Sequence, residues 1–212
     1  MNFDVFLKYI PQILEEKLPG DNAHVEMMPL ERIAIFKDLD LEKINPREAS
    51  VMMLFYPKNE EPHLVMILRN SYKGVHSSQI GFPGGKVEKF DVSLADTALR
   101  ETFEEIGIDK EWINIVKPFT PLYIPPSNFK VYPFLGYATQ ELIFNPDERE
   151  VFGIIEMPLS VLMDDSAKVR KKLSTSYMEE VDVPAFKFQE YYIWGATSQM
   201  LNELKEVLKS VF

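Results

Sequence analysis

The stretch that is most informative about the fold lies in the middle of the chain, at residues 84–108, with the sequence GGKVEKFDVSLADTALRETFEEIGI. A pair of glycines opens it, and an acidic run with helical periodicity follows. Its apolar residues recur at the three- and four-residue spacing of a helix face that packs on a core. Ser93 stands in the place of an N-cap, with Asp96 three residues later as in a capping box. Gly107 follows the last apolar position, where a left-handed C-cap favours glycine. The pattern therefore predicts a helix from Ser93 to Ile106.

The charges near the end of this helix are unfavourable for an isolated helix. Glu104 and Glu105 lie in the last turn, which carries partial negative charge, and Glu101 precedes them by three and four residues on the same face. Each misplaced charge costs about 0.3–1 kcal/mol, and Arg100 offsets only part of this. We interpret the three glutamates as ligands of Mg²⁺ or Mn²⁺, with the Gly85 carbonyl as a further ligand, because hard cations bind such oxygens. A solvated acidic helix face is the alternative.

The second half of this stretch resembles the Nudix box, in which a glycine and a loop acid precede R-E-x-x-E-E-x-G and an aliphatic residue. Every fixed position of that half is matched, by Arg100, Glu101, Glu104, Glu105, Gly107 and Ile108. In the first half, the chain has one more residue than usual before Arg100, and Asp91 stands where glutamate is usual. The resemblance implies the Nudix fold, an α+β architecture in which a mixed β-sheet lies between helices as an α/β/α sandwich.

A second motif runs from Arg69 to the glycine pair and resembles the coenzyme A pyrophosphatase branch of the Nudix family. The arginine, histidine and glutamine of that branch, and its F-P-G-G, fall on Arg69, His76, Gln79 and residues 82–85. The chain departs from the branch at Lys73-Gly74, where leucine and arginine are usual. The resemblance implies a coenzyme A or acyl-CoA substrate, cleaved to 3′,5′-ADP and 4′-phosphopantetheine.

Four residues of this second motif are candidates for binding the substrate: Arg69, Lys73, His76 and Gln79. Arg69 ends a predicted buried strand, where a guanidinium can make a bidentate contact with phosphate. His76 could contact phosphate or carry a proton near neutral pH, and a structural histidine is an equal alternative. Gln79 is better explained as a hydrogen-bonding support for the loop.

Hydrolysis at phosphorus needs a base that accepts a proton from the attacking water. Glu101 and Glu104 are the candidates, with Glu150 in reserve at the start of a predicted strand, and Arg100 is predicted to orient a helix glutamate by a charge-assisted bond. Two alternatives stay open. One is a Nudix hydrolase acting on ADP-ribose, dinucleoside polyphosphates or oxidised nucleotides, and the other is a non-catalytic nucleotide-binding module.

Apolar runs at residues 49–56 and 63–68 predict a hairpin buried on both faces. Further predicted elements are strands at 79–82, 112–116, 130–138 and 150–155, a short helix from Pro158, a hairpin at 171–194 and a closing helix from Thr197 to Val211. Residues 3–18 predict two helical pieces separated near Pro11. We expect residues 1–46 to form an N-terminal helical extension packed on a main domain, 47–212; an arm that binds a partner is the alternative.

Composition narrows the class of protein. The 212 residues include no cysteine, which excludes disulfides, thiolate-bound zinc and a thiol nucleophile, and which fits a cytoplasmic protein. The net charge of −10 argues against broad binding to nucleic acid or to an anionic membrane. No apolar run approaches the length of about 18 residues that suggests a membrane span. We therefore expect a small-molecule nucleotide, CoA-like, as the partner of a monomer or homodimer.

Overall fold

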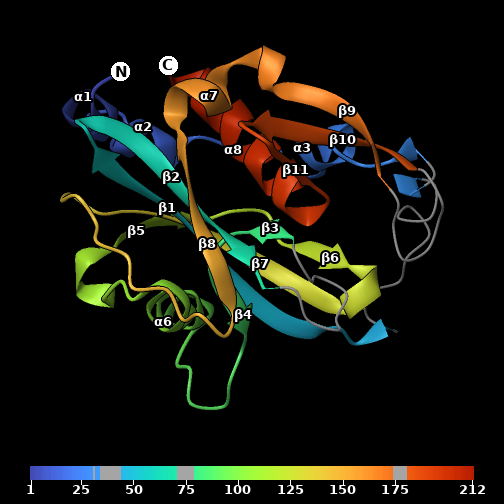
Figure 1. Ribbon diagram of the computed structural model, residues 1–212, viewed down its shortest axis with the longest axis horizontal. Helices are drawn as coiled ribbons and strands as arrows, with labels where there is room; N and C mark the ends of the chain where they lie inside the picture. Colours follow the sequence, from blue (N-terminus) through green and yellow to red (C-terminus); the bar gives the residue numbers. More distant parts are fainter. Residues whose placement is uncertain (31, 34–43, 71–78, 174–180) are drawn as a thin grey trace.

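The computed structural model describes residues 1–30, 32–33, 44–70, 79–173 and 181–212 (Figure 1). Its helices are α1 (Phe3–Leu7), α2 (Ile10–Glu15), α3 (Asp21–Glu26), α6 (Leu94–Ile106), α7 (Leu159–Met163) and α8 (Ala196–Val211), with 3₁₀ turns η1 (Lys110–Trp112), η2 (Pro125–Ser127) and η3 (Asp165–Ala167). Its strands are β1 (Arg47–Lys58), β2 (Glu61–Arg69), β3 (Ile80–Gly81), β4 (Gly84–Lys86), β5 (Asn114–Pro118), β6 (Leu122–Ile124), β7 (Phe129–Tyr137), β8 (Val151–Pro158), β9 (Lys168–Leu173), β10 (Val181–Phe188) and β11 (Tyr191–Trp194).

An eight-stranded mixed sheet forms the centre of the molecule, in the order β3-β2-β1-β7-β5. Strand β4 pairs with β1, β6 with β7 and β8 with β2. Strands β1 and β7 are parallel, whereas β1 and β2 form the predicted antiparallel hairpin. The hairpin turn is tighter than expected, because Pro57 still pairs with Pro62 and only Asn59 and Glu60 remain between the strands. Both have positive φ, as a two-residue type I′ turn requires.

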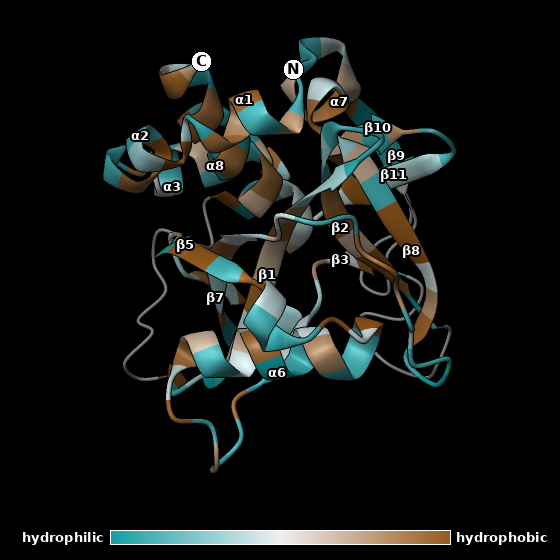
Figure 2. Cartoon of the chain, turned by 90° about the vertical axis from the view of Figure 1, so that its left-hand side faces the viewer, coloured by the Kyte–Doolittle hydropathy of each residue, from teal (hydrophilic) through white to brown (hydrophobic). Residues whose placement is uncertain are grey.

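Helices cover both faces of this sheet (Figures 1 and 2). Helix α6 lies on one face, and α8 lies on the other with α7 and the three N-terminal helices. Along β1, Met52 and Leu54 belong to the core under α6, whereas Met53 and Phe55 belong to the core under α8. Both faces of the strand are therefore buried, which confirms the predicted α+β sandwich with a mixed sheet between helices.

The N-terminal helices contribute to the core on the α8 side. Phe6 of α1 and Ile13 of α2 are fully buried there. The two helical pieces are confirmed, but the break falls at residues 8–9. Pro11 lies in the first turn of α2 instead, where a missing backbone N–H leaves no helical hydrogen bond unmade. The division of the chain at residue 46 stays a prediction.

Several element bounds differ from those expected. The predicted hairpin at 171–194 is part of a separate three-stranded antiparallel sheet, β11-β10-β9, which begins at Lys168; residues 174–180 lie outside the described residues. The 3₁₀ turn η1 occupies the start of the strand predicted at 112–116, so β5 begins at Asn114, and the short strand β6 lies between the strands predicted at 112–116 and 130–138. The closing helix is confirmed as α8. Within the described ranges, no helix is long and apolar enough to cross a membrane.

Candidate active site

Helix α6 carries most of the candidate residues, and its ends form as predicted. The Ser93 hydroxyl accepts a hydrogen bond from the Asp96 backbone N–H at 3.0 Å, and Gly107 closes the helix in the left-handed region at φ 73°. The helix packs on β1 and β4. The glycine pair belongs to the short strand β4, which pairs with β1.

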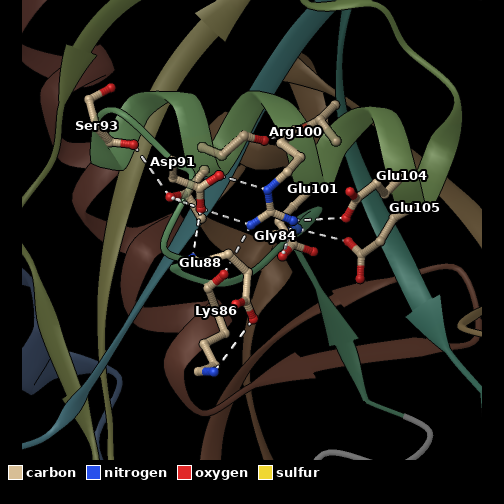
Figure 3. Close-up of polar contacts among 12 residues, drawn as sticks. Gly84, Lys86, Glu88, Asp91, Ser93, Arg100, Glu101, Glu104 and Glu105 are labelled. Carbon is tan, nitrogen blue, oxygen red and sulfur yellow. Dashed lines mark hydrogen bonds and ion pairs between the residues drawn. The ribbon is translucent and has the colours of Figure 1, made fainter.

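Arg100 stands at the centre of the polar contacts (Figure 3). Its Nε and Nη2 donate to the two carboxylate oxygens of Asp91 at 2.8 and 3.0 Å. Its Nη1 donates to Glu101 Oε1 at 2.7 Å and to Glu104 Oε2 at 2.8 Å, and Nη2 also donates to the Lys86 carbonyl at 3.0 Å. The guanidinium thus makes the contact with helix glutamates that the predicted orienting role requires.

Asp91 is a site residue whose role the sequence left open. Its side chain is 1% exposed, and it also accepts hydrogen bonds from the Glu88 N–H and the Thr97 hydroxyl, both at 2.8 Å. The hydrogen bonds from Arg100 hold the pKa of Asp91 well below its usual range. Asp91 therefore anchors Arg100 from the loop side. The only signal for this in the sequence is its place as the loop acid of the box.

Glu105 lies beneath the helix and is 2% exposed. Its Oε2 accepts a hydrogen bond from the Gly84 N–H at 2.8 Å, and its Oε1 lies 3.2 Å from Arg69 Nη2. That ion pair lacks hydrogen-bond geometry, so Oε1 is a buried oxygen with no hydrogen-bond partner in the described ranges. Burial raises the pKa of Glu105 to about 7, although Arg69 and the Gly84 N–H favour the charged form.

Glu101 and Glu104 occupy different environments. The Glu101 side chain is 15% exposed and its carboxylate lies against Gly85, where a Cβ atom would overlap it. Burial raises the pKa of Glu101, and the charges of Glu104 and Glu150 act in the same direction. Glu104 is 53% exposed. The three glutamates thus differ in side-chain burial, from buried Glu105 through Glu101 to exposed Glu104, and do not form one solvated face.

Glu150 lies in the turn before β8, and its side chain is exposed. Its carbonyl accepts a hydrogen bond at 2.9 Å from the backbone N–H of Asn70, which directly follows β2. The negative charge of Glu150 contributes to the raised pKa values of both Glu101 and Glu105. The structure therefore brings Glu150 within electrostatic reach of the helix acids.

Two of the four predicted substrate-binding residues are described. Arg69 ends β2, is 22% exposed and donates from Nη2 to the Gly84 carbonyl at 2.9 Å. The Gln79 carbonyl accepts from the Arg69 N–H at 3.1 Å. Both residues therefore adjoin the box. Lys73 and His76 lie outside the described residues.

The arrangement of the candidate metal ligands, which are the three helix glutamates and the Gly85 carbonyl, suits a hard cation only in part. In the described portion of the chain, no three His, Asp or Glu side chains converge as a metal site. Arg100 pairs with Glu101 and Glu104, and Arg69 pairs with Glu105, so the two arginines together offset part of the repulsion among the helix glutamates. The fit lies in Glu105 Oε1, a buried oxygen that accepts no hydrogen bond within the described part of the chain, and in the close approach of the Gly85 backbone to Glu101.

A family model described as the NUDIX domain matches residues 44–177. The chain belongs to the Nudix family. It is similar to the "Uncharacterized Nudix hydrolase NudL" of Enterobacter sp. (strain 638), with 31% identity over 168 residues, 76% of this chain and 82% of the relative. The protein of the same name from Yersinia enterocolitica is 30% identical over 153 residues, covering 69% and 74% of the two chains.

Solved structures confirm the Nudix fold. The Nudix hydrolase RenU from M. smegmatis aligns with a TM-score of 0.55 at 13% identity, over 79% of this chain and 88% of that one. The NUDIX domain of Shewanella oneidensis NrtR, solved with ADP ribose, aligns with a TM-score of 0.50 at 13% identity, over 83% and 97%. The chain is a Nudix hydrolase, an enzyme that acts on nucleoside diphosphate derivatives; such enzymes generally use divalent metal cations.

Proposed function

We propose that this Nudix hydrolase cleaves the pyrophosphate of coenzyme A or of an acyl-CoA. The observation that carries the proposal is the position of Arg69. It belongs to the upstream motif that resembles the coenzyme A pyrophosphatase branch, and its guanidinium lies 3.2 Å from Glu105 of the box. A guanidinium has five N–H groups, and at 22% exposure Arg69 can present some of them to a substrate phosphate.

The proposed metal ligands are Glu101, Glu104, Glu105 and the Gly85 carbonyl, and the proposed ion is Mg²⁺ or Mn²⁺. Such an ion, when bound, neutralises pyrophosphate charge and lowers the pKa of a bound water. Two observations support this set: among the described residues Glu105 Oε1 accepts no hydrogen bond, and a Cβ at Gly85 would overlap the Glu101 carboxylate.

The protein's own groups have separate tasks in this proposal. Glu101 or Glu104 accepts the proton of the attacking water, with Glu150 as the alternative base. Arg100 keeps the two helix glutamates in place through Nη1, and Asp91 keeps Arg100 in place. The cationic groups Arg69, Lys73 and His76, on the loop from Arg69 to Gln79, hold the 3′-phosphate of coenzyme A. We further propose a cytoplasmic protein that works as a monomer or homodimer.

A substrate panel tests this function. Coenzyme A, dephospho-CoA, ADP-ribose and a dinucleoside tetraphosphate would be incubated with the enzyme and millimolar Mg²⁺ or Mn²⁺, and the products identified. We expect 3′,5′-ADP and 4′-phosphopantetheine from coenzyme A. Loss of a charge-assisted contact costs roughly 1.5–3 kcal/mol, so dephospho-CoA should be cleaved about ten- to a hundredfold less efficiently.

Two results of the panel would correct the proposal. Equal efficiency on coenzyme A and dephospho-CoA would mean that the enzyme does not recognise the 3′-phosphate. Faster cleavage of ADP-ribose or of the dinucleoside tetraphosphate would replace the substrate and leave the pyrophosphatase chemistry standing. Lys73→Ala is the matched variant, since it should narrow the preference for coenzyme A without changing the rate on ADP-ribose.

A further inference from the structure

The buried hydroxyl of Ser50, on the strand that pairs with the glycines of the box, has no part in the function proposed so far. Ser50 is fully buried in β1, and its Oγ has no hydrogen-bond partner among the residues that the structure describes. Buried polar atoms of native proteins are almost always hydrogen-bonded, so an exception calls for an explanation. An alanine at position 50 would be buried in the same way and would leave no unsatisfied hydroxyl.

The pleat of β1 determines which way this hydroxyl faces. Met52 and Leu54, two and four residues further along, pack in the core under α6. Side chains two residues apart in a strand lie on the same face, so Ser50 also faces α6. Strand β4 runs antiparallel to β1, and in that pair Ser50 is directly opposite Gly85.

Gly85 is also the residue against which Glu101 packs. A Cβ at Gly85 would overlap the Glu101 carboxylate, so that carboxylate lies over the position opposite Ser50. Opposite residues of an antiparallel pair have Cβ positions about 4.5–5.5 Å apart, which is within reach of a serine hydroxyl. Arg100 binds Glu101 through Oε1, and Oε2 is among the atoms that the Gly85 Cβ would overlap.

We propose that Ser50 is a positioning residue of the Nudix site, whose hydroxyl donates a hydrogen bond to Glu101 Oε2 when the site holds its divalent cation. Arg100 would then hold one oxygen of the carboxylate and Ser50 the other, so that the remaining lone pairs face the cation. This inference rests on the proposed role of Glu101 as a metal ligand. It does not depend on which nucleotide is cleaved.

Metal binding without substrate tests this inference. Mn²⁺ affinity would be measured by electron paramagnetic resonance for the wild type, Ser50→Ala and Ser50→Thr, together with the melting temperature in EDTA. We expect Ser50→Ala to melt in EDTA at or above the wild-type temperature, because it removes an unsatisfied donor. Its Mn²⁺ affinity and its kcat should both fall about tenfold with KM little changed, as is typical when a residue behind a metal ligand is lost.

Two variants separate this role from simple packing. Ser50→Thr keeps the hydroxyl and should recover Mn²⁺ affinity and kcat. Ser198→Ala is the matched control, since Ser198 is also fully buried but its hydroxyl already donates to the Gly195 carbonyl at 2.8 Å. It should lower the melting temperature and leave Mn²⁺ affinity unchanged. If Ser50→Ala does not fold, Ser50→Cys, with a similar shape and a weak donor, should show the same loss of affinity.

The outcomes separate this inference from the function on which it rests. Wild-type Mn²⁺ affinity and kcat in the folded Ser50 variants would overturn the role of Ser50 and leave the metal site intact. A wild-type enzyme that binds no Mn²⁺ would overturn the metal ligands and the role of Ser50 together. A different substrate preference in the panel would change neither result.

Discussion

At the scale of the residue, Arg100 shows how one side chain organises an acidic site. It makes hydrogen bonds to Asp91, Glu101, Glu104 and the Lys86 carbonyl with three different nitrogens. The fork of a guanidinium can do this because its donors lie in one plane at fixed angles. A compact ammonium group cannot reach both Asp91 and the helix glutamates in this way.

Replacement of Arg100 by lysine should therefore reduce catalysis. We expect Arg100→Lys to lose at least about tenfold in kcat/KM, or roughly 1.4 kcal/mol. The melting temperature should also fall, because the buried Asp91 loses its bidentate partner. Steady-state kinetics and thermal unfolding measure the two effects. Arg170→Lys is the matched control, since the Arg170–Asp182 pair is half exposed and should contribute little. Equal behaviour of the two variants would remove the orienting role of Arg100.

The same contacts predict a dependence of stability on acid. The pKa of Asp91 is depressed in the folded protein, so its contribution to stability is complete above its unfolded pKa of about 3.9 and is lost as the pH falls through the folded value. Asp91→Asn should be less stable than the wild type at pH 6, and the two should converge as the pH falls below about 4. Urea unfolding at several pH values measures this difference. A constant difference down to pH 2 would contradict it.

At the scale of the element, the two glycines of β4 have different tasks. Gly84 has φ 155°, and a Cβ there would overlap the backbone carbonyl of Ser50, which cannot move without disturbing the sheet. The three atoms nearest to a Cβ at Gly85 would all belong to the Glu101 carboxylate, the end of a flexible side chain rather than backbone. The first glycine is therefore required for strand pairing and the second for the position of a carboxylate.

Alanine at each position should separate these tasks. Gly84→Ala should lower the free energy of unfolding by more than about 2 kcal/mol, because strand backbones must shift. Gly85→Ala should change stability much less and should reduce turnover and Mn²⁺ affinity by about tenfold or more. Chemical denaturation and Mn²⁺ titration of the two variants measure this contrast. Loss of stability in both with full metal affinity in Gly85→Ala would show that β4 only supports the sheet.

At the scale of the whole molecule, the core extends beyond the region that the family model matches. Phe6 of α1 is fully buried and its ring centroid lies 4.9 Å from that of Phe55 in β1. The Phe3 backbone N–H donates to the Glu60 carbonyl of the β1–β2 turn at 2.7 Å. These contacts favour a packed extension over an arm that binds a partner.

Replacement of Phe6 by alanine tests whether the N-terminal helices form a packed extension. Phe6→Ala should lower the free energy of unfolding by about 3–5 kcal/mol, as the loss of a buried phenylalanine does in a core. Unfolding should stay a single transition that metal binding shifts as a whole. Val5→Ala is the control on the same helix, since Val5 is 39% exposed. If Phe6→Ala left stability unchanged, the N-terminal helices would be a separate arm.

Local interactions explain what could be predicted from the sequence. The bounds of α6 follow from a serine N-cap, a glycine C-cap and a 3.6-residue apolar repeat, all within one segment. The β1–β2 hairpin follows in the same way from two short apolar runs with a turn between them. The family and the glutamates of the Nudix box could also be identified from the sequence, because the residues of the motif lie in one continuous segment.

Contacts between distant segments decided the rest. The depth of Glu105 depends on β4 and on Arg69, which is 36 residues away, whereas Glu104 in the same helical turn stays exposed. The partner of Arg100 comes from the loop at Asp91, and the position of Ser50 opposite Gly85 comes from strand pairing. Helical periodicity determines which face of α6 a side chain occupies. The groups that meet this face, and with them the burial and the charge of each carboxylate, follow only from how the sheet and its loops pack against it.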